Sequence, residues 1–107
     1  MCTKSQLEAI EEEMVNYYRS VYGDSIDTII LYGSYARGDY SDDSDIDITA
    51  IVRGNRVELQ KKLKKMWDFS TEVGLAYDVI VSPTVIPYDE FEQYKEKLPY
   101  YRNIVKE

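Results

Sequence analysis

The chain has 107 residues, of which 44% are apolar and 31% charged, with a formal charge of −7 and a pI near 4.6. This length suits one small domain, which we expect to span residues 1–107 without a separate substrate-recognition domain. The acidic balance argues against non-specific nucleic-acid binding, because that affinity comes from basic groups that neutralise phosphates.

The residue types that are missing or rare restrict the chemistry further. There is no histidine, which excludes Ser-His-Asp and Cys-His triads. Cys2 is the only cysteine, so neither an internal disulfide nor a cysteine-rich zinc site is expected. No apolar stretch approaches the roughly 20 residues of a membrane span, and no secretory signal is visible. We therefore expect a cytoplasmic protein that uses carboxylates, hydroxyls, lysine or arginine.

The first half of the chain predicts a helix, a strand and a loop. The helix is expected to run for about four turns from the capping-box pattern Ser5-x-x-Glu8 and to stop at Gly23-Asp24. β-Branched and apolar residues over 26–32 predict a buried strand. Small, polar and acidic residues over 34–44 predict a tight turn and then a loop.

The second half predicts two more strands with a helix between them. A strand is expected over 45–52, an amphipathic helix over 57–69, and a third strand over 75–81 that is closed by Ser82-Pro83. A short helical pattern and a tyrosine-rich tail follow over 87–107. This order predicts a mixed β-sheet flanked by helices, in the α/β to α+β range.

Two acidic residues on the second predicted strand carry the strongest chemical signal. Asp45 and Asp47 are two positions apart, so both carboxylates project to the same side of a strand. Two such charges repel unless they are solvated, protonated or bridged by a cation, and hard oxygen ligands suit Mg²⁺. A pair of this kind on an exposed strand is by itself more often a solvated surface feature.

Two further features lie on the neighbouring predicted strands. Gly33-Ser34 follows the first strand and could present backbone N–H groups and a hydroxyl to a phosphate, although such a sequence is usually only a turn. Asp78 is a single acid within an apolar run, where a charge needs a partner unless the residue faces solvent from an edge strand.

Together these residues resemble a known enzyme superfamily. Gly33-Ser34, ten further residues and then Asp45-Ile46-Asp47 reproduce the G-S-x10-D-x-D signature of the DNA polymerase β-like nucleotidyltransferases. The surrounding sequence is most similar to the minimal nucleotidyltransferase (MNT) group, whose members are often encoded beside a HEPN-domain protein. Asp78 stands where that family has its third carboxylate. The resemblance implies the polymerase β-like palm fold.

The resemblance also implies roles for individual residues. Asp45, Asp47 and Asp78 would be the catalytic carboxylates and would hold two Mg²⁺ ions, with Asp78 as an acceptor for the proton of the attacking hydroxyl. Gly33, Ser34 and Arg37 would bind the triphosphate of ATP. For Arg37, an ion pair with Asp42 or Asp43 is an equally good interpretation.

The implied function is transfer of AMP from ATP to a hydroxyl of a protein, as the antitoxin of a HEPN toxin. A small-molecule acceptor and a non-catalytic binding module are the alternatives. The lysines at 61, 62, 64 and 65 are better interpreted as the solvated face of a helix than as a nucleic-acid patch. Some tyrosines could form a partner-binding surface, because tyrosine is enriched at interfaces; the candidates are Tyr88, Tyr94, Tyr100 and Tyr101.

Overall fold

The computed structural model describes residues 3–33, 38, 45–97 and 101–104. Its elements follow in the order α1 (Lys4–Tyr22), η1 (Gly23–Ser25), β1 (Ile26–Tyr32), β2 (Ile46–Val52), α3 (Arg56–Tyr77), β3 (Val81–Pro87), α4 (Tyr88–Tyr94), η2 (Lys95–Lys97) and β4 (Tyr101–Asn103). None of the helices in these ranges combines the length and apolar character that a membrane crossing needs.

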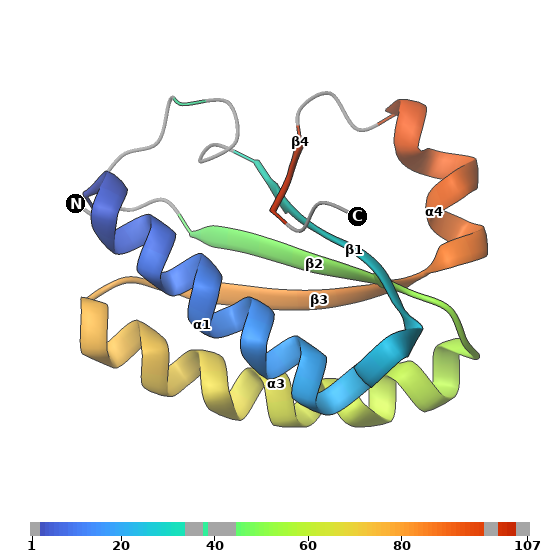
Figure 1. The fold of residues 1–107 in the computed structure, drawn as a ribbon, viewed down its shortest axis with the longest axis horizontal. Helices are drawn as coiled ribbons and strands as arrows, with labels where there is room; N and C mark the ends of the chain where they lie inside the picture. The colour runs from blue at the N-terminus through green and yellow to red at the C-terminus, as the bar shows by residue number, and fades with distance from the viewer. Residues whose placement is uncertain (1–2, 34–37, 39–44, 98–100, 105–107) are drawn as a thin grey trace.

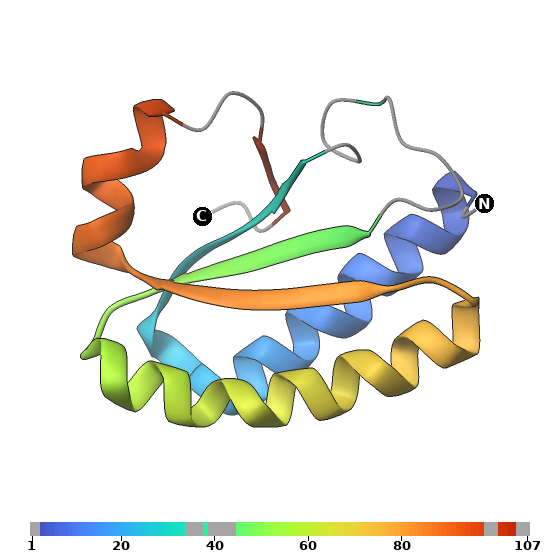
Figure 2. The ribbon, with the colours of Figure 1, turned by 180° about the vertical axis from the view of Figure 1, so that it is seen from behind.

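The four strands form one mixed sheet in the order β3-β2-β1-β4. β1 pairs antiparallel with both β2 and β4, whereas β2 and β3 are parallel and are joined through α3. Figures 1 and 2 show α1 and α3 on one side of the sheet and α4 on the other. The mixed sheet flanked by helices agrees with the fold class that the sequence predicts.

The side of the sheet that packs against α1 and α3, here called the first face, carries the main core. Strand residues alternate between faces, so every second residue of β2 enters this core. Ile10, Met14 and Tyr18 of α1 are fully buried against it, as is Met66 of α3. The strand members are Ile26, Ile29 and Leu31 of β1, Ile46, Ile48, Ala50 and Val52 of β2, and Val81 and Val85 of β3.

Two buried tyrosines of α1 donate hydrogen bonds that attach the helix to its neighbours. The Tyr18 hydroxyl lies 2.8 Å from the carbonyl oxygen of Thr84 and 3.1 Å from that of Ile48, between β2 and β3. The Tyr22 hydroxyl donates to the Leu59 carbonyl at 2.8 Å, and burial raises the pKa of Tyr22 to about 12. A phenol that reaches a carbonyl in this way can be buried without leaving its oxygen unsatisfied.

The opposite side, here called the second face, carries Asp47, Thr49 and Ile51 of β2. Among the described elements, α4 packs against this face. Phe91 of α4 packs on Ile30 and Ile51, with Ile86 and Tyr88 beside them. This smaller cluster lies toward the carboxyl end of β2, so α4 leaves the end that begins at Ile46 less covered. That end contains the residues singled out from the sequence.

Two predicted boundaries at helix ends are wrong. The capping box of α1 is formed by Thr3 and Gln6 rather than by Ser5 and Glu8, with Thr3 Oγ1 accepting from the Gln6 N–H at 3.1 Å. The predicted strand over 75–81 is also wrong. Residues 75–77 complete α3, and β3 starts only at Val81, because the core positions of α3 keep their helical spacing through Val73 and Gly74.

Candidate active site

The two acidic residues of the D-x-D pattern lie together at the start of β2. Asp45 immediately precedes the strand and is exposed, while Asp47 is its second residue and is half-buried. Since Ile46 and Ile48 are buried on the first face, Asp47 projects from the second face. Burial raises the pKa of Asp47, and the charge of Asp45 raises it further. The two carboxylates therefore sense each other, as their spacing predicts.

The strand register places Asp47 in a row of four residues across the second face. Asp47 pairs with Ser82 on β3 and with Tyr32 on β1, and Tyr32 in turn pairs with Tyr101 on β4. Directly paired residues of neighbouring strands point to the same face. We call Ser82, Asp47, Tyr32 and Tyr101 the acidic row. Tyr101 makes an edge-on contact with Phe91 of α4 at 5.9 Å between ring centroids, which places its ring on the second face.

Gly33 lies directly against the Asp47 carboxylate. Its φ is +79°, and a Cβ at this position would come within 2.8 Å of Asp47 Oδ2. Both the backbone conformation and the space thus require glycine. The sequence suggests that this glycine lets a phosphate approach the main chain; in the structure the group that approaches it is the carboxylate itself. Ser34 and Arg37, the other predicted nucleotide-binding residues, lie outside the described residues.

Asp78 occupies a different setting from the one expected. It caps the C-terminus of α3 in the left-handed conformation, with φ 57° and ψ 48°, and it is exposed rather than held within a strand. It still lies near the amino end of β2, because the Ile46 N–H donates to the carbonyl of Ile80 at 2.8 Å, two residues beyond Asp78. The described residues contain no group of three or more acidic, cysteine or histidine side chains arranged to hold a metal.

The Asp45–Asp47 pair nevertheless fits a divalent cation. Among the described residues, no hydrogen bond or ion pair reaches either carboxylate. A half-buried carboxylate beside a second one, with no compensating donor among the described residues, favours a cation, and oxygen ligands of this kind suit Mg²⁺. The two aspartates would supply the protein ligands for such an ion.

The hydroxyl groups that lie near the Asp45–Asp47 pair were not predicted from the sequence. Ser82 belongs to the acidic row, and the next row contains Thr49 and Thr84, whose Oγ1 atoms lie 2.5 Å apart. The alternation in Val81-Ser82-Pro83-Thr84-Val85 is a strand pattern that could have revealed them. It was obscured by the proline, which favours the end of a strand.

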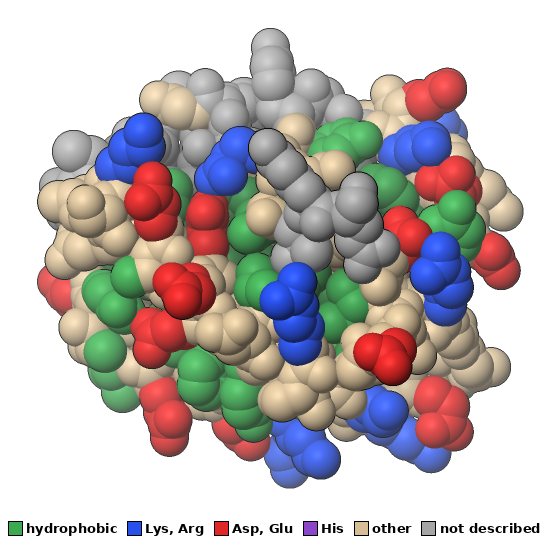
Figure 3. All heavy atoms as spheres, viewed as in Figure 1, with side chains coloured by type: hydrophobic (Ala, Val, Ile, Leu, Met, Phe, Trp, Pro, Cys, Tyr) green, Lys and Arg blue, Asp and Glu red, His purple; other side chains and the backbone are tan. Residues whose placement is uncertain are grey.

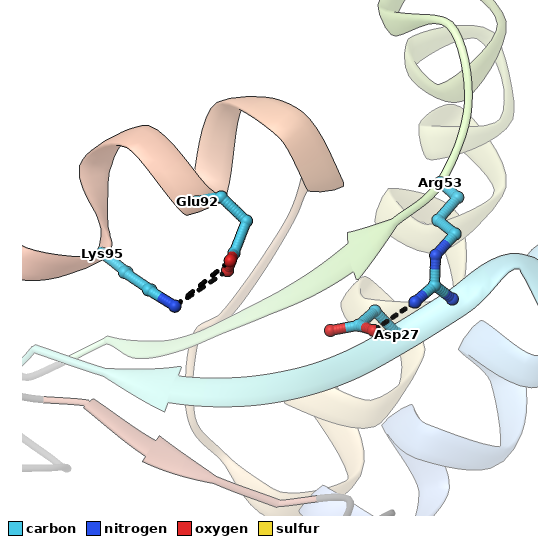
Figure 4. A network of polar contacts seen from close by, with 4 residues as sticks. All are labelled: Asp27, Arg53, Glu92 and Lys95. Carbon is cyan, nitrogen blue, oxygen red and sulfur yellow. Dashed lines mark hydrogen bonds and ion pairs between the residues drawn. The ribbon is translucent and has the colours of Figure 1, made fainter.

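Other polar features lie at the opposite end of the sheet. Arg53, just after β2, pairs with Asp27 at 2.8 Å (Figure 4). Its guanidinium also lies 4.9 Å from the ring centroid of Tyr88. A shallow cleft there is lined by Arg53, Gly54, Tyr88 and Asp89. On the face shown in Figure 3, acidic and basic side chains are interspersed, without an extended basic patch among the described atoms. The lysines at 61, 62, 64 and 65 are exposed on α3, as either interpretation of them requires.

Comparison with known proteins adds to this geometry. A family model described as "Nucleotidyltransferase domain" matches residues 8–107. Two proteins of Methanocaldococcus jannaschii are similar to the chain. "Putative protein adenylyltransferase MJ0141" is 33% identical over 74% of this chain and 80% of its own length. "Putative protein adenylyltransferase MJ0604" is 35% identical over 90% of this chain and 88% of its own length.

Two solved structures share the fold. One, described as a toxin-antitoxin with AMP-PNP, has a TM-score of 0.57 at 18% identity and covers 91% of this chain and 73% of its own. The other, described as "a putative nucleotidyltransferase from Sulfolobus solfataricus", has a TM-score of 0.51 at 21% identity and covers 95% of this chain and 78% of its own.

Proposed function

Because this chain belongs to the nucleotidyltransferase family, we propose that it transfers AMP from ATP to a hydroxyl group of a protein partner. The carboxylate pair Asp45 and Asp47 beside Gly33 carries this proposal, since it is the part of the described structure that can organise a metal-bound triphosphate. The names of the two archaeal relatives support a protein acceptor.

The proposed reaction is an in-line displacement at the α-phosphorus of ATP. The acceptor hydroxyl oxygen forms the new bond to this phosphorus, and the bond from phosphorus to the oxygen that bridges to the β-phosphate breaks. Pyrophosphate leaves with that electron pair. The products are the AMP-modified acceptor, pyrophosphate and one proton. When bound, Mg²⁺ supplies charge neutralisation on the triphosphate and a lower pKa for the attacking hydroxyl.

The chain's own residues orient the nucleotide and accept the proton. Asp45 and Asp47 would hold the metal ions, two per site in this proposal, while Gly33, Ser34 and Arg37 would bind the phosphates. We assign the proton to Asp78. In the structure it caps α3 instead of joining the pair, so this role requires the short segment between α3 and β3 to bring its carboxylate toward Asp45 when nucleotide binds.

The proposed acceptor is a HEPN-domain toxin, with this chain as its antitoxin. The structural neighbour described as a toxin-antitoxin with AMP-PNP supports this assignment, together with the MNT-like motif. The second face offers one wall of a substrate site beside the acidic row, and a bound protein would supply the other wall. A protein acceptor therefore suits the geometry better than a small molecule.

The test of the transfer reaction is direct. The protein is incubated with ATP and Mg²⁺, with and without its HEPN-domain partner, and intact mass spectrometry looks for the mass of AMP on either protein. The double variant Asp45→Asn/Asp47→Asn should abolish the adduct, and Asp68→Asn on the exposed side of α3 is the matched control. An adduct that persists in the double variant would overturn the mechanism. Neutralisation of the toxin without any adduct would show a binding module instead.

Asp78 has its own test. Asp78→Asn should lower the rate of AMP transfer by about 10²- to 10⁴-fold while nucleotide binding is retained, because a general base contributes on this scale in the chemical step. The measurement compares single-turnover rates with equilibrium binding of ATP. An unchanged rate in Asp78→Asn would remove this residue from the catalytic set and leave the other assignments standing.

A further inference from the structure

A lysine at the end of α4 projects toward the second face of the sheet. Lys95 follows α4 as the first residue of η2, and its ammonium pairs with the Glu92 carboxylate at 3.1 Å. Figure 4 shows both side chains projecting from α4 and η2 toward the sheet, well away from the Arg53–Asp27 pair. The two side chains are 41% and 40% exposed, so the pair is solvated and can be exchanged at small cost.

Lys95 lies close to the acidic row. Phe91, one helical turn before Lys95, makes an edge-on contact with the Tyr101 ring at 5.9 Å between centroids, so Lys95 lies beside the Tyr101 end of this row. Glu92 raises the pKa of Lys95, and Tyr101 and Tyr88 raise it to a smaller extent. Tyr101 is separated from Asp47 by Tyr32 alone in the strand order. With about 5 Å between Cα atoms of paired strands, the two positions are roughly 10 Å apart.

Three arginines of the described structure are engaged elsewhere. Arg53 pairs with Asp27 and Arg56 with Glu90 toward the other end of the sheet, and Arg102 pairs with Glu11 of α1. Lys97, two residues beyond Lys95, lies 5.6 Å from the ring centroid of Tyr94. A nucleoside triphosphate brought to the two aspartates would add negative charge to an already acidic chain, so a cation beside the acidic row would be favourable.

We propose that Lys95 is a phosphate-binding residue of the nucleotide site. The α-phosphate of the bound triphosphate lies at Asp45 and Asp47. The Lys95 ammonium then leaves the Glu92 carboxylate and binds the outer phosphates. This inference rests on the proposed function. Glu92 holds the lysine extended toward the acidic row in the absence of nucleotide. Phosphate oxygens then replace the carboxylate with a stronger, charge-assisted contact.

The test measures binding rather than turnover. Isothermal titration with Mg²⁺ and AMP-PNP should show affinity weakened about tenfold in Lys95→Gln, because a hydrogen bond to a charged group is lost. Lys95→Arg should restore most of the affinity. Lys97→Gln is the matched control and should bind as the wild type does, and Glu92→Gln should bind equally well or a few-fold more tightly.

AMP distinguishes a phosphate contact from a general disturbance. Since AMP lacks the outer phosphates, its affinity should be the same for wild type and Lys95→Gln. Equal losses for AMP and AMP-PNP, or AMP-PNP binding within twofold of wild type in Lys95→Gln, would overturn the inference while the proposed function stands. If the wild type itself binds no AMP-PNP with Mg²⁺, the proposed function fails and this inference fails with it.

Discussion

Gly33 links a backbone conformation to the position of the Asp47 carboxylate. Gly33→Ala would place a methyl group 2.8 Å from Asp47 Oδ2 at a φ of +79°. We expect a loss of about 1–3 kcal/mol in the free energy of unfolding, together with a large loss of AMP transfer because Asp47 is displaced. Urea unfolding and the transfer assay measure the two effects.

Gly23 provides the control for this substitution. Its φ is +62°, but a Cβ there meets nothing within 4 Å. Gly23→Ala should therefore cost a similar amount of stability and leave nucleotide transfer unchanged in the folded fraction. Comparable transfer by the two alanine variants would show that the contact between Gly33 and Asp47 has no catalytic consequence.

Asp47 gives a pH-dependent stability whose direction is fixed by its raised pKa. The Asp47 carboxyl group binds its proton more tightly in the folded chain than in the unfolded chain. Ionised Asp47 therefore lowers the free energy of unfolding above the pKa of the folded chain. This loss disappears as the pH falls below the ordinary value of 3.8. Without metal, Asp47→Asn should be more stable than wild type at neutral pH, and the difference should shrink on acidification. Denaturant titrations in EDTA across this range measure it.

Mg²⁺ should reverse the order of stability of the wild type and Asp47→Asn. Mg²⁺ at 100 times its dissociation constant should stabilise the wild type by about 2.7 kcal/mol and the asparagine variant by much less. A variant that is less stable than wild type at neutral pH without metal would show that the carboxylate is held by a contact absent from the described residues.

At the scale of single elements, the end of α3 explains both a wrong prediction and the position of Asp78. The apolar run over 75–81 resembles a strand by composition, yet a Cβ on Gly74 would lie 2.6 Å from the carbonyl oxygen of Val79. The chain folds back on this glycine, and the Val79 N–H donates to the Gly74 carbonyl at 3.0 Å. Strand propensity does not reveal such a close approach of two backbone segments.

Gly74→Ala should therefore open the turn that follows α3. We expect a loss of about 1–3 kcal/mol from overpacking, with a change in the backbone amide signals of residues 78–80 in NMR spectra. Glu72→Ala, on the exposed side of the same helix, should stay within about 0.5 kcal/mol of wild type. An equally stable Gly74→Ala protein would contradict the close approach of Val79.

The strands show where sequence reasoning succeeds and where it stops. β1 and β2 have the predicted bounds to within one residue, because runs of β-branched residues next to glycine define them locally. β4 is not predicted, since Tyr101–Asn103 becomes a strand only by pairing with β1. The carboxylate pair could be identified from its spacing after Gly33-Ser34, whereas Tyr32, Ser82 and Lys95 join it only through the register and the placement of α4.

At the scale of the whole molecule, an ion pair connects distant parts of the chain. Glu11 of α1 is 6% exposed, and its carboxylate accepts from Arg102 of β4 at 2.5 Å. Arg102→Ala should cost about 1–3 kcal/mol, because it leaves a buried carboxylate without its donor. Glu11→Gln should recover part of this loss in the double variant, and a thermodynamic cycle from urea unfolding measures the coupling.

The exposed pair of Arg53 and Asp27 is the comparison. Although its N–O distance is 2.8 Å, Arg53 is 58% exposed, and the pair should contribute less than about 1 kcal/mol. A coupling energy for Glu11 and Arg102 no larger than that of this surface pair would show that β4 is held by its strand pairing alone.

Two prolines of β3 affect whether the edge of the sheet can pair with a strand of another molecule. β3 is an edge strand of the sheet. The Ile46 N–H donates to the Ile80 carbonyl, so in a parallel ladder the even-numbered residues of β3 bond to β2. The main-chain groups of the odd-numbered residues therefore point outward, away from β2. Pro83 and Pro87 occupy two of these outward positions and have no N–H to offer. This edge is therefore a poor template for another strand, which disfavours edge-to-edge aggregation of this protein at high concentration.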